Sequence, residues 1–596
     1  MRMHLKLLNT KIRQHAAGIV VSLFVALLAV APHILFSFSL GPEYRGVHMF
    51  ATPNEEAYIA IMQEILDGHP STASMPFFEY KDKFPLLPAT LAHLYTFPVK
   101  WFGISLISVL LFSKFLLPGL LCFAVYLLTF HILEADDSQK SKAGFYASAA
   151  ALMVTLGFDL VDYRSVWAYL LGSASPEGFF IWTRPVNPVF GGILLFFFLL
   201  CVWNIYRGLR EKRWIIVGGL SLSLMMASYV FSWTLALTIL GLCFIGAFFK
   251  HQYKECRAYI SIFVLGLLFS LPYWLRALEA AQDQWYPEAA ARIGLYLTRE
   301  PHLNLFVLAV TLLFAGISFI LYFKKGILGS WTRWWSFSFF LILASWIVYN
   351  QQVITGREIW YYHYVFYTIP LMYVVVIVLF WHAVRLRFPR SALAAVGFMA
   401  IASLALGVFQ QVSAYQKNEP IFRERQWYAD VFAFFNTQAQ KDCVVLINEE
   451  DISWWSNLIP AFTHCNTYHS GENQSVLADP EDFVYRYMSV LRLRGITKDS
   501  IHGYLATHKQ EVEHALQFQL QHTLGLPDPK LQTRFERFAD DYIRFMDTDF
   551  LEALSRFRID YILSEGPLDK TVFASLSSLN LVFEEHEMAV FHLQKE

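Results

Sequence analysis

Charged side chains are scarce in this chain. Of its 596 residues, 16% are Asp, Glu, Lys or Arg, whereas 56% are hydrophobic and 17% are aromatic. One soluble core does not need so large an apolar share, so the composition predicts a protein that crosses a membrane several times. The formal net charge is -1, which gives no global electrostatic bias towards nucleic acid or an acidic partner.

Several familiar motifs are also missing. The sequence contains no Walker loop, no GxGxxG and no HExxH, and it has neither repeats nor low-complexity tracts. Cysteine is rare, with six residues, and only Cys443 and Cys465 fall in the hydrophilic C-terminal part. Two interpretations of this pair stay open: a disulfide formed in an oxidising compartment, or two buried free thiols.

Long apolar runs, in contrast, are abundant. A helix of roughly 20 residues crosses a bilayer, and eleven runs reach about that length: 17–40, 105–132, 144–158, 188–205, 214–229, 231–249, 258–275, 304–323, 333–349, 362–383 and 391–411. The segment 214–249 fits either a tight hairpin of two short helices or one long bent helix. The predicted fold class is mainly α, a polytopic helical bundle of about eleven spans.

Basic residues mark every second loop between these runs. They occur in the N-terminal segment and around 140–142, 207–213, 250–257, 324–325 and 385–390. Because Lys and Arg are retained in cytoplasmic loops, these loops and the N-terminus are predicted to be cytoplasmic. The loops at 41–104, 159–187, 276–303 and 350–361 then lie outside, as does everything after residue 411. The few cysteines and the compact loops indicate a prokaryotic plasma membrane.

The C-terminal third differs from the rest of the chain. After residue 411 the charge rises and the long apolar runs end. Short runs typical of strands lie at 442–450, 560–565, 581–586 and 588–594, and helical patterns lie at 480–494, 507–523 and 531–547. We therefore expect a transmembrane domain over 1–411 and a small extracytoplasmic α/β domain over 412–596.

An acidic pair opens a helical pattern soon after the first span. The stretch TPNEEAYIAIMQEILDGHP predicts a helix over 53–67, and Thr52 and Glu55 have the spacing of a capping box. By helical periodicity Asn54 falls on the buried face, Glu55 at its edge and Glu56 on the wetter side. Glu55 is either a helix cap or a carboxylate that points into a cavity.

Three more stretches on the same predicted side carry polar groups among aromatic residues. They are FFEYKDKFP with Lys81, WTRPVNPVF with Arg184 and Asn187, and NQQVITGREIWYYHY with Arg357 and His363. Together they would hold a lipid-linked phosphate at the cations and a sugar between aromatic and amide groups. Taken singly, each charge fits a solvated loop residue, and Arg184 and His363 also fit anchors at the membrane interface.

These features resemble the polytopic GT-C glycosyltransferases, which use polyprenyl-phosphate sugar donors. That superfamily includes the protein O-mannosyltransferases and the aminoarabinose transferases of lipid A. The resemblance covers most of the membrane part and depends on the acidic pair before Tyr58, the polytopic layout and the C-terminal domain, with RPVNP and 350–364 in addition. It implies sugar transfer to a lipid, glycan or protein acceptor outside the membrane.

The resemblance also implies roles for residues. Relatives carry Asp-Glu in the first outer loop, and alignment on Tyr58 places that Asp on Asn54, which cannot accept a proton. Glu55, with Glu56, then takes the role of base, and an alignment shifted by one residue places the pair on these two glutamates. The assigned roles are catalysis for Glu55, Glu56 and Asn54, donor-phosphate binding for Arg184, Arg357 and Lys81, and substrate-pocket lining for Asn187 and His363. No metal or other cofactor is predicted, because no ligand spacing fixes a site.

Two other interpretations stay open. A transporter or lipid-handling protein without chemistry fits the polytopic layout, although such proteins often carry inverted repeats and charged residues within their spans. Here the spans contain few charges, with Lys114 as an exception. The other interpretation is a catalytically inactive GT-C relative whose outer domain binds a partner, and Asn54 is its main support.

Overall fold

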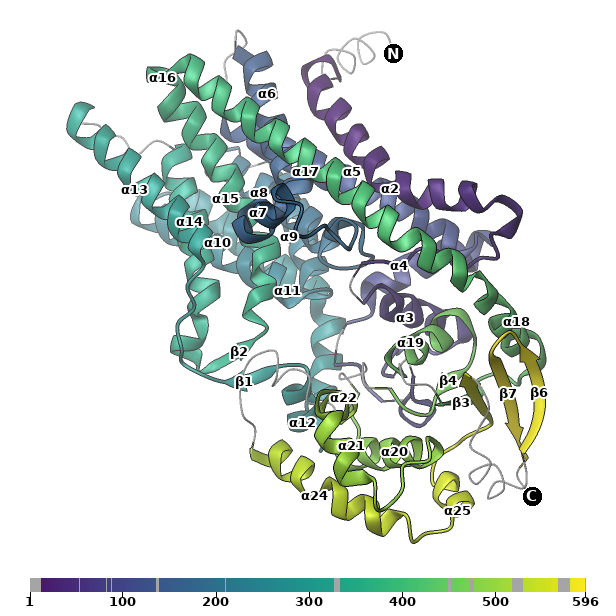
Figure 1. Cartoon of the computed structure of the whole chain (residues 1–596). Helices are drawn as coiled ribbons and strands as arrows, with labels where there is room; N and C mark the ends of the chain where they lie inside the picture. Colours follow the sequence, from purple (N-terminus) through teal and green to yellow (C-terminus); the bar gives the residue numbers. More distant parts are fainter. Residues whose placement is uncertain are drawn as a thin grey trace.

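The computed structural model describes residues 12–594, apart from positions 53, 75, 82, 87 and 210 and the segments 135–138, 326–332, 449–451, 471–475, 517–528 and 566–578. Its larger part is a bundle of helices (Figure 1). The main helices of the bundle are α2 (Ala16–Leu40), α5 (Leu106–Ile132), α6 (Lys140–Thr155), α8 (Val189–Tyr206), α9 (Lys212–Met226), α10 (Val230–Phe249), α11 (Tyr253–Ala280), α13 (Leu305–Lys325), α14 (Arg333–Thr355), α15 (Val365–Leu379) and α17 (Pro389–Glu424).

Each predicted span coincides with one of these helices. Within the described residues, eight helices are long and apolar enough to cross a membrane, and α6, α9 and the apolar part of α13 are shorter. The ambiguous segment 214–249 forms two helices, α9 and α10, separated by residues 227–229. The polytopic, mainly α fold class is therefore confirmed.

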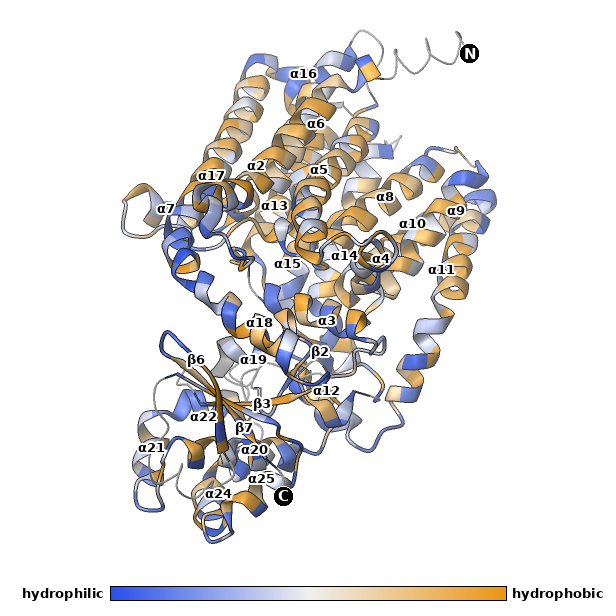
Figure 2. Cartoon of the chain, turned by 90° about the vertical axis from the view of Figure 1, so that its right-hand side faces the viewer, coloured by the Kyte–Doolittle hydropathy of each residue, from blue (hydrophilic) through white to orange (hydrophobic). Residues whose placement is uncertain are grey.

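Apolar side chains cover both the inside and the outside of the bundle. The inner core is built from α5, α6, α8 and α15. On the outside, Phe112, Phe398 and Ile401 are 60%, 72% and 68% exposed, and apolar colour dominates the bundle helices in Figure 2. Exposed apolar surface of this extent marks a face that meets lipid rather than water.

Shorter elements connect the bundle helices. They are η1 (Gly41–Glu43), α3 (Glu55–Asp67), η2 (Phe78–Tyr80), α4 (Thr90–Phe102), η4 (Phe158–Val161), α7 (Tyr163–Leu170), η5 (Ile181–Thr183), α12 (Tyr286–Arg292), β1 (Leu295–Leu297), β2 (Arg357–Ile359), η7 (Tyr361–Tyr364), η8 (Phe380–Val384) and α16 (Arg385–Arg387). Strands β1 and β2 pair antiparallel, with Tyr296 opposite Glu358. This pairing joins the loops 276–303 and 350–361.

The C-terminal region is an α/β unit, as predicted. It contains η9 (Arg425–Trp427), α18 (Tyr428–Gln438), β3 (Val444–Asn448), α19 (Ile452–Phe462), β4 (Asn466–Thr467), α20 (Pro480–Leu493), α21 (Ile501–Thr507), α22 (Lys509–Ala515), α24 (Pro529–Phe545), α25 (Phe550–Ser555), β5 (Tyr561–Glu565), β6 (Leu579–Glu585) and β7 (Met588–Leu593). The sheet has the order β4-β3-β5-β7-β6, and β3 is parallel to both of its neighbours. The four predicted strands are present, whereas β4 has two residues and is too short to show a pattern.

Helices cover both faces of this sheet. Along β3, Val444 and Leu446 pack in a cluster with α20, while Val445 and Ile447 pack in another with α18. This follows from the alternation of side chains in a strand. Helix α17 continues to Glu424, so the boundary predicted after residue 411 falls inside it.

A disulfide closes one edge of the sheet. Cys443, which precedes β3, is bonded to Cys465, which precedes β4, with 4.5 Å between their α-carbons. Of the two interpretations of this pair, the structure contains the disulfide. The four other cysteines are free and buried: Cys122, Cys201, Cys243 and Cys256.

Candidate functional site at the start of helix α3

Helix α3 lies at the end of the bundle that faces the C-terminal region (Figure 1). It ends as predicted at Asp67, and the next residue, Gly68, has a φ of 106°, which suits glycine, and its N–H bonds to the carbonyl oxygen of Glu64. It begins at Glu55, two residues later than predicted, and Pro53 lies outside the described residues.

Glu55 is fully buried at the first turn of α3. Its Oε2 accepts hydrogen bonds from the Thr52 backbone N–H, at 3.3 Å, and from the Thr52 hydroxyl, at 2.7 Å. The first bond has the residue spacing of a capping box, although the helix begins at Glu55 itself and Asn54, rather than Thr52, is its cap residue. In the second, the threonine hydroxyl donates to the carboxylate instead of accepting from the backbone, so the cap interpretation is only partly correct.

The other oxygen of Glu55 has a partner that the sequence did not assign. Its Oε1 forms an ion pair with the ammonium of Lys114, on α5, whose side chain is 1% exposed. The same ammonium donates to the backbone oxygen of Thr183 at 3.2 Å. The signal available in the sequence was the presence of a lysine within an apolar run, where a charge requires a partner.

Asn54 does not occupy the buried face that helical periodicity predicted. Its side chain is exposed and its φ is +55°, in the left-handed region. The prediction was wrong because the helix begins after this residue, so helical spacing does not extend back to it. Asparagine tolerates this conformation better than most residues. Glu55 is buried rather than at the edge, and Glu56 is half-buried.

Arg184 and Asn187 lie beside the same turn of α3. Arg184 is 7% exposed and Asn187 is 5% exposed. The guanidinium donates to the Asn187 backbone oxygen at 2.5 Å and to the Tyr58 hydroxyl at 3.5 Å, and lies 5.4 Å from the centre of the Tyr58 ring. Lys114 contacts Glu55 and Arg184 contacts Tyr58, one turn further along α3. The two cations therefore flank the same turn of this helix.

His363 belongs to an aromatic group next to Arg184. Its Nδ1 lies 2.5 Å from the Tyr229 hydroxyl, and its ring lies 5.0 Å from Trp360 and 5.1 Å from Phe231. The guanidinium of Arg184 lies close enough to His363 and Tyr229 to interact with both electrostatically. The described part of the chain therefore places a buried carboxylate, two cations and several aromatic rings in one neighbourhood.

The two remaining predicted cations are placed differently. Arg357 is exposed on β2, where its backbone oxygen accepts from Gln351 at 2.8 Å. Lys81 is 4% exposed, and its ammonium is paired with Glu64 at 2.5 Å. This pairing argues against the donor-phosphate role expected for Lys81, because it holds the ammonium near the other end of α3 from Glu55.

The sequence comparisons and the structure comparisons give different results. No protein-family model matches the chain, and no curated protein matches it. Among solved structures, it is similar to the apo oligosaccharyltransferase of Archaeoglobus fulgidus, with 12% identity and a TM-score of 0.49 over 92% of this chain and 69% of that one. It is also similar to ArnT from Cupriavidus metallidurans bound to undecaprenyl phosphate, with 10% identity and a TM-score of 0.44 over 96% and 98%.

A third similar structure is the arabinofuranosyltransferase AftD from mycobacteria, with 12% identity and a TM-score of 0.44 over 98% of this chain and 42% of that one. All three are membrane glycosyltransferases of the GT-C superfamily, the group that the sequence resembles. Identities of 10–12% and TM-scores below 0.5 assign no residue role and no substrate to this chain.

Proposed function

We propose that this protein is a membrane glycosyltransferase that moves a sugar from a polyprenyl-phosphate donor to an acceptor outside the cytoplasm. The observation that carries the proposal is the buried Glu55 one turn of α3 before Tyr58, whose hydroxyl accepts a hydrogen bond from Arg184, at the end of the bundle next to the C-terminal region. A carboxylate and a guanidinium in a sheltered site supply the base and the anion partner that this transfer requires.

In the proposed mechanism, each side chain has one task. The Glu55 carboxylate accepts the proton of an acceptor hydroxyl, while Lys114 neutralises and orients it. The Arg184 guanidinium stabilises the departing lipid phosphate, where negative charge develops. Tyr58 and the aromatic group around His363 offer ring faces to the sugar. The solved ArnT complex holds undecaprenyl phosphate, a polyprenyl phosphate without a sugar, which corresponds to the carrier that the proposed transfer releases.

We also propose that the N-terminus is cytoplasmic and that the C-terminal domain, over 412–596, lies outside a prokaryotic plasma membrane. The alternation of basic loops supports this orientation. The start of α2 and the C-terminal sheet lie at opposite ends of the bundle (Figures 1 and 2). The disulfide Cys443–Cys465 fits an oxidising compartment.

The decisive experiment measures donor binding and turnover together. Purified protein in nanodiscs is given polyprenyl phosphates that carry different labelled sugars, and sugar release or transfer is followed. Wild type should turn over at least one donor, and R184Q should weaken binding of the bare polyprenyl phosphate at least tenfold. The matched control is R164Q, because Arg164 is exposed on α7. Equal binding by wild type and R184Q would overturn the role of Arg184.

An active site that binds donor but never turns it over would favour the inactive interpretation. Transport of an intact lipid across the membrane without sugar release would favour the transporter interpretation. Both outcomes contradict the proposed chemistry.

A further inference from the structure

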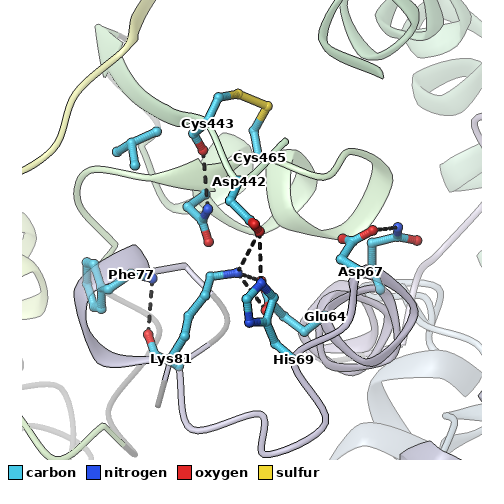
Figure 3. Close-up of polar contacts among 12 residues, drawn as sticks. Glu64, Asp67, His69, Phe77, Lys81, Asp442, Cys443 and Cys465 are labelled. Carbon is cyan, nitrogen blue, oxygen red and sulfur yellow. Dashed lines mark hydrogen bonds and ion pairs between the residues drawn. A yellow bond between two sulfur atoms is a disulfide. The ribbon is translucent and has the colours of Figure 1, made fainter. Parts of the chain in front are cut away.

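The far end of α3 carries a second buried carboxylate–lysine pair. Glu64 is 3% exposed and Lys81 is 4% exposed. The Lys81 ammonium lies 2.5 and 2.6 Å from the two carboxylate oxygens of Glu64 (Figure 3). Helix α3 therefore has a buried glutamate–lysine pair near each end, with Glu55–Lys114 at the first turn and Glu64–Lys81 near the last.

This second pair reaches the C-terminal domain. Lys81 Nζ lies 3.8 Å from Oδ1 of Asp442, and His69 Nε2 lies 2.9 Å from the same oxygen (Figure 3). We call Glu64, His69, Lys81 and Asp442 the Glu64 cluster. Glu64, His69 and Lys81 come from the loop 41–104, and Asp442 comes from the chain just before β3.

Asp442 is itself held firmly. The next residue is the disulfide-bonded Cys443, and the backbone N–H of Asp442 bonds to the carbonyl oxygen of His464 at 3.1 Å. Helix α19 of the C-terminal domain also packs along α3. The C-terminal domain thus contacts α3 both along its side and at its end.

Burial of these charges is costly, so their retention calls for a reason other than stability. The free-energy cost of removing two charges from water offsets most of the attraction between them. An apolar pair of similar size often stabilises the fold equally well. What a buried pair does supply is a fixed geometry. Glu64 lies nine positions after Glu55 in the helix, a rise of about 13.5 Å, so a shift at one end of this rigid helix displaces the other.

We propose that Glu64, Lys81 and Asp442 are positioning residues, through which the C-terminal domain sets the position of Glu55 in the site. This inference depends on the proposed transferase function. The C-terminal domain is then required for the chemistry even where it contacts no substrate. A misplacement of about 1 Å costs on the order of a hundredfold in rate.

The test compares D442N with a matched control, D283N. Asp283 pairs with Lys83 at 2.9 Å. Lys83 belongs to the loop 41–104, as Lys81 does, but its side chain is 42% exposed. We expect D442N to lower kcat ten- to a hundredfold with the donor KM unchanged, and to speed amide hydrogen exchange in α3 at least tenfold. D283N should change neither quantity. A change confined to KM, or unchanged exchange in α3 with normal kcat, would overturn the proposal.

A second comparison separates positioning from loss of folding. K81M leaves Glu64 buried without a cation, whereas the double variant E64Q/K81M removes both charges. The double variant should regain the wild-type thermal midpoint but not the wild-type kcat, since the link from Glu64 through Lys81 to Asp442 is lost and only the contact of His69 with Asp442 remains. Full recovery of kcat would mean that the cluster is only structural.

The exchange measurement also keeps the two proposals distinguishable. If wild type transfers no sugar, the proposed function fails, while faster exchange in α3 of D442N still establishes the coupling. If wild type is active and D442N has normal exchange and kcat, the coupling alone fails.

Discussion

The carboxylate of Glu55 and the ammonium of Lys114 form a buried ion pair that fixes α3 to α5, with side-chain exposures of 0% and 1%. The two residues are 59 positions apart. Lys114 links the same carboxylate to the Thr183 carbonyl, and thereby to the segment that carries Arg184. The pair therefore connects the proposed base with the proposed phosphate ligand.

Loss of Lys114 should damage both stability and activity. K114M leaves Glu55 buried without its cation, which we expect to lower the free energy of unfolding by about 3–5 kcal/mol. The double variant E55Q/K114M should recover much of that stability, because no charge remains buried, yet should stay inactive. Thermal unfolding in detergent and a donor-turnover assay measure the two effects. Equal stability of K114M and wild type would contradict the ion pair.

Glu55 and Glu56 should differ strongly in their effect on rate. E55Q keeps the shape of the side chain but cannot accept a proton, so we expect a loss of about a hundredfold to ten-thousandfold in kcat. E56Q is the matched control, because Glu56 is adjacent and half-buried, and it should stay within about threefold of wild type. The reverse order would move the base to Glu56. Full activity of E55Q would leave Glu55 as a helix cap.

Asn54 should matter for the backbone more than for the chemistry. Its φ of +55° is strained for most residues, so N54A should cost about 1 kcal/mol of stability. N54D and N54G should be nearly neutral, because both residues tolerate this conformation. Unfolding midpoints of the three variants measure the effect. A gain in turnover for N54D would instead show that the natural asparagine limits activity.

Glu64 should make stability depend on pH. Burial raises the pKa of Glu64 from 4.5 to about 7, against the opposing charge of Lys81. The folded chain then binds this proton more tightly than the unfolded chain does. The contribution of Glu64 is fully present below pH 4.5 and is lost as the pH rises towards 7. Burial also raises the pKa of the neighbouring Asp67. A variant of Glu64 alone leaves Asp67 in place, so comparison with wild type isolates the contribution of Glu64.

That variant is E64Q, which does not titrate. Unfolding curves between pH 4 and 8 should show wild type losing more stability than E64Q as the pH rises. Parallel curves for the two proteins would contradict the raised pKa of Glu64.

The orientation of the chain can be tested directly. A reporter that is active only outside the cytoplasm, fused after Glu596, should be active. The same reporter fused in the basic loop 207–213 should be inactive, since Lys and Arg retain that loop in the cytoplasm. Activity of a cytoplasm-specific reporter after Glu596 would reverse the proposed topology.

The sequence by itself determined the helical bundle, the position of its spans and four of the five strands that the structure describes in the C-terminal sheet. These features depend on composition and on local periodicity, which neighbouring residues carry. The fifth strand, β4, has two residues, too few for a period. Helical spacing placed Asn54 wrongly, because α3 begins only after this residue. The left-handed backbone of Asn54 cannot be predicted from the periodicity of apolar residues.

The contacts that define the site were decided only by the tertiary structure. Lys81 was expected at a phosphate, but a buried ammonium requires a carboxylate nearby, and Glu64 supplies it. Lys114 was visible as an odd charge in an apolar run, while its partner Glu55 lies in another segment. Which charges meet depends on how α3, α5 and the C-terminal domain pack together. That packing is fixed by buried surfaces from distant parts of the chain, and no single segment contains it.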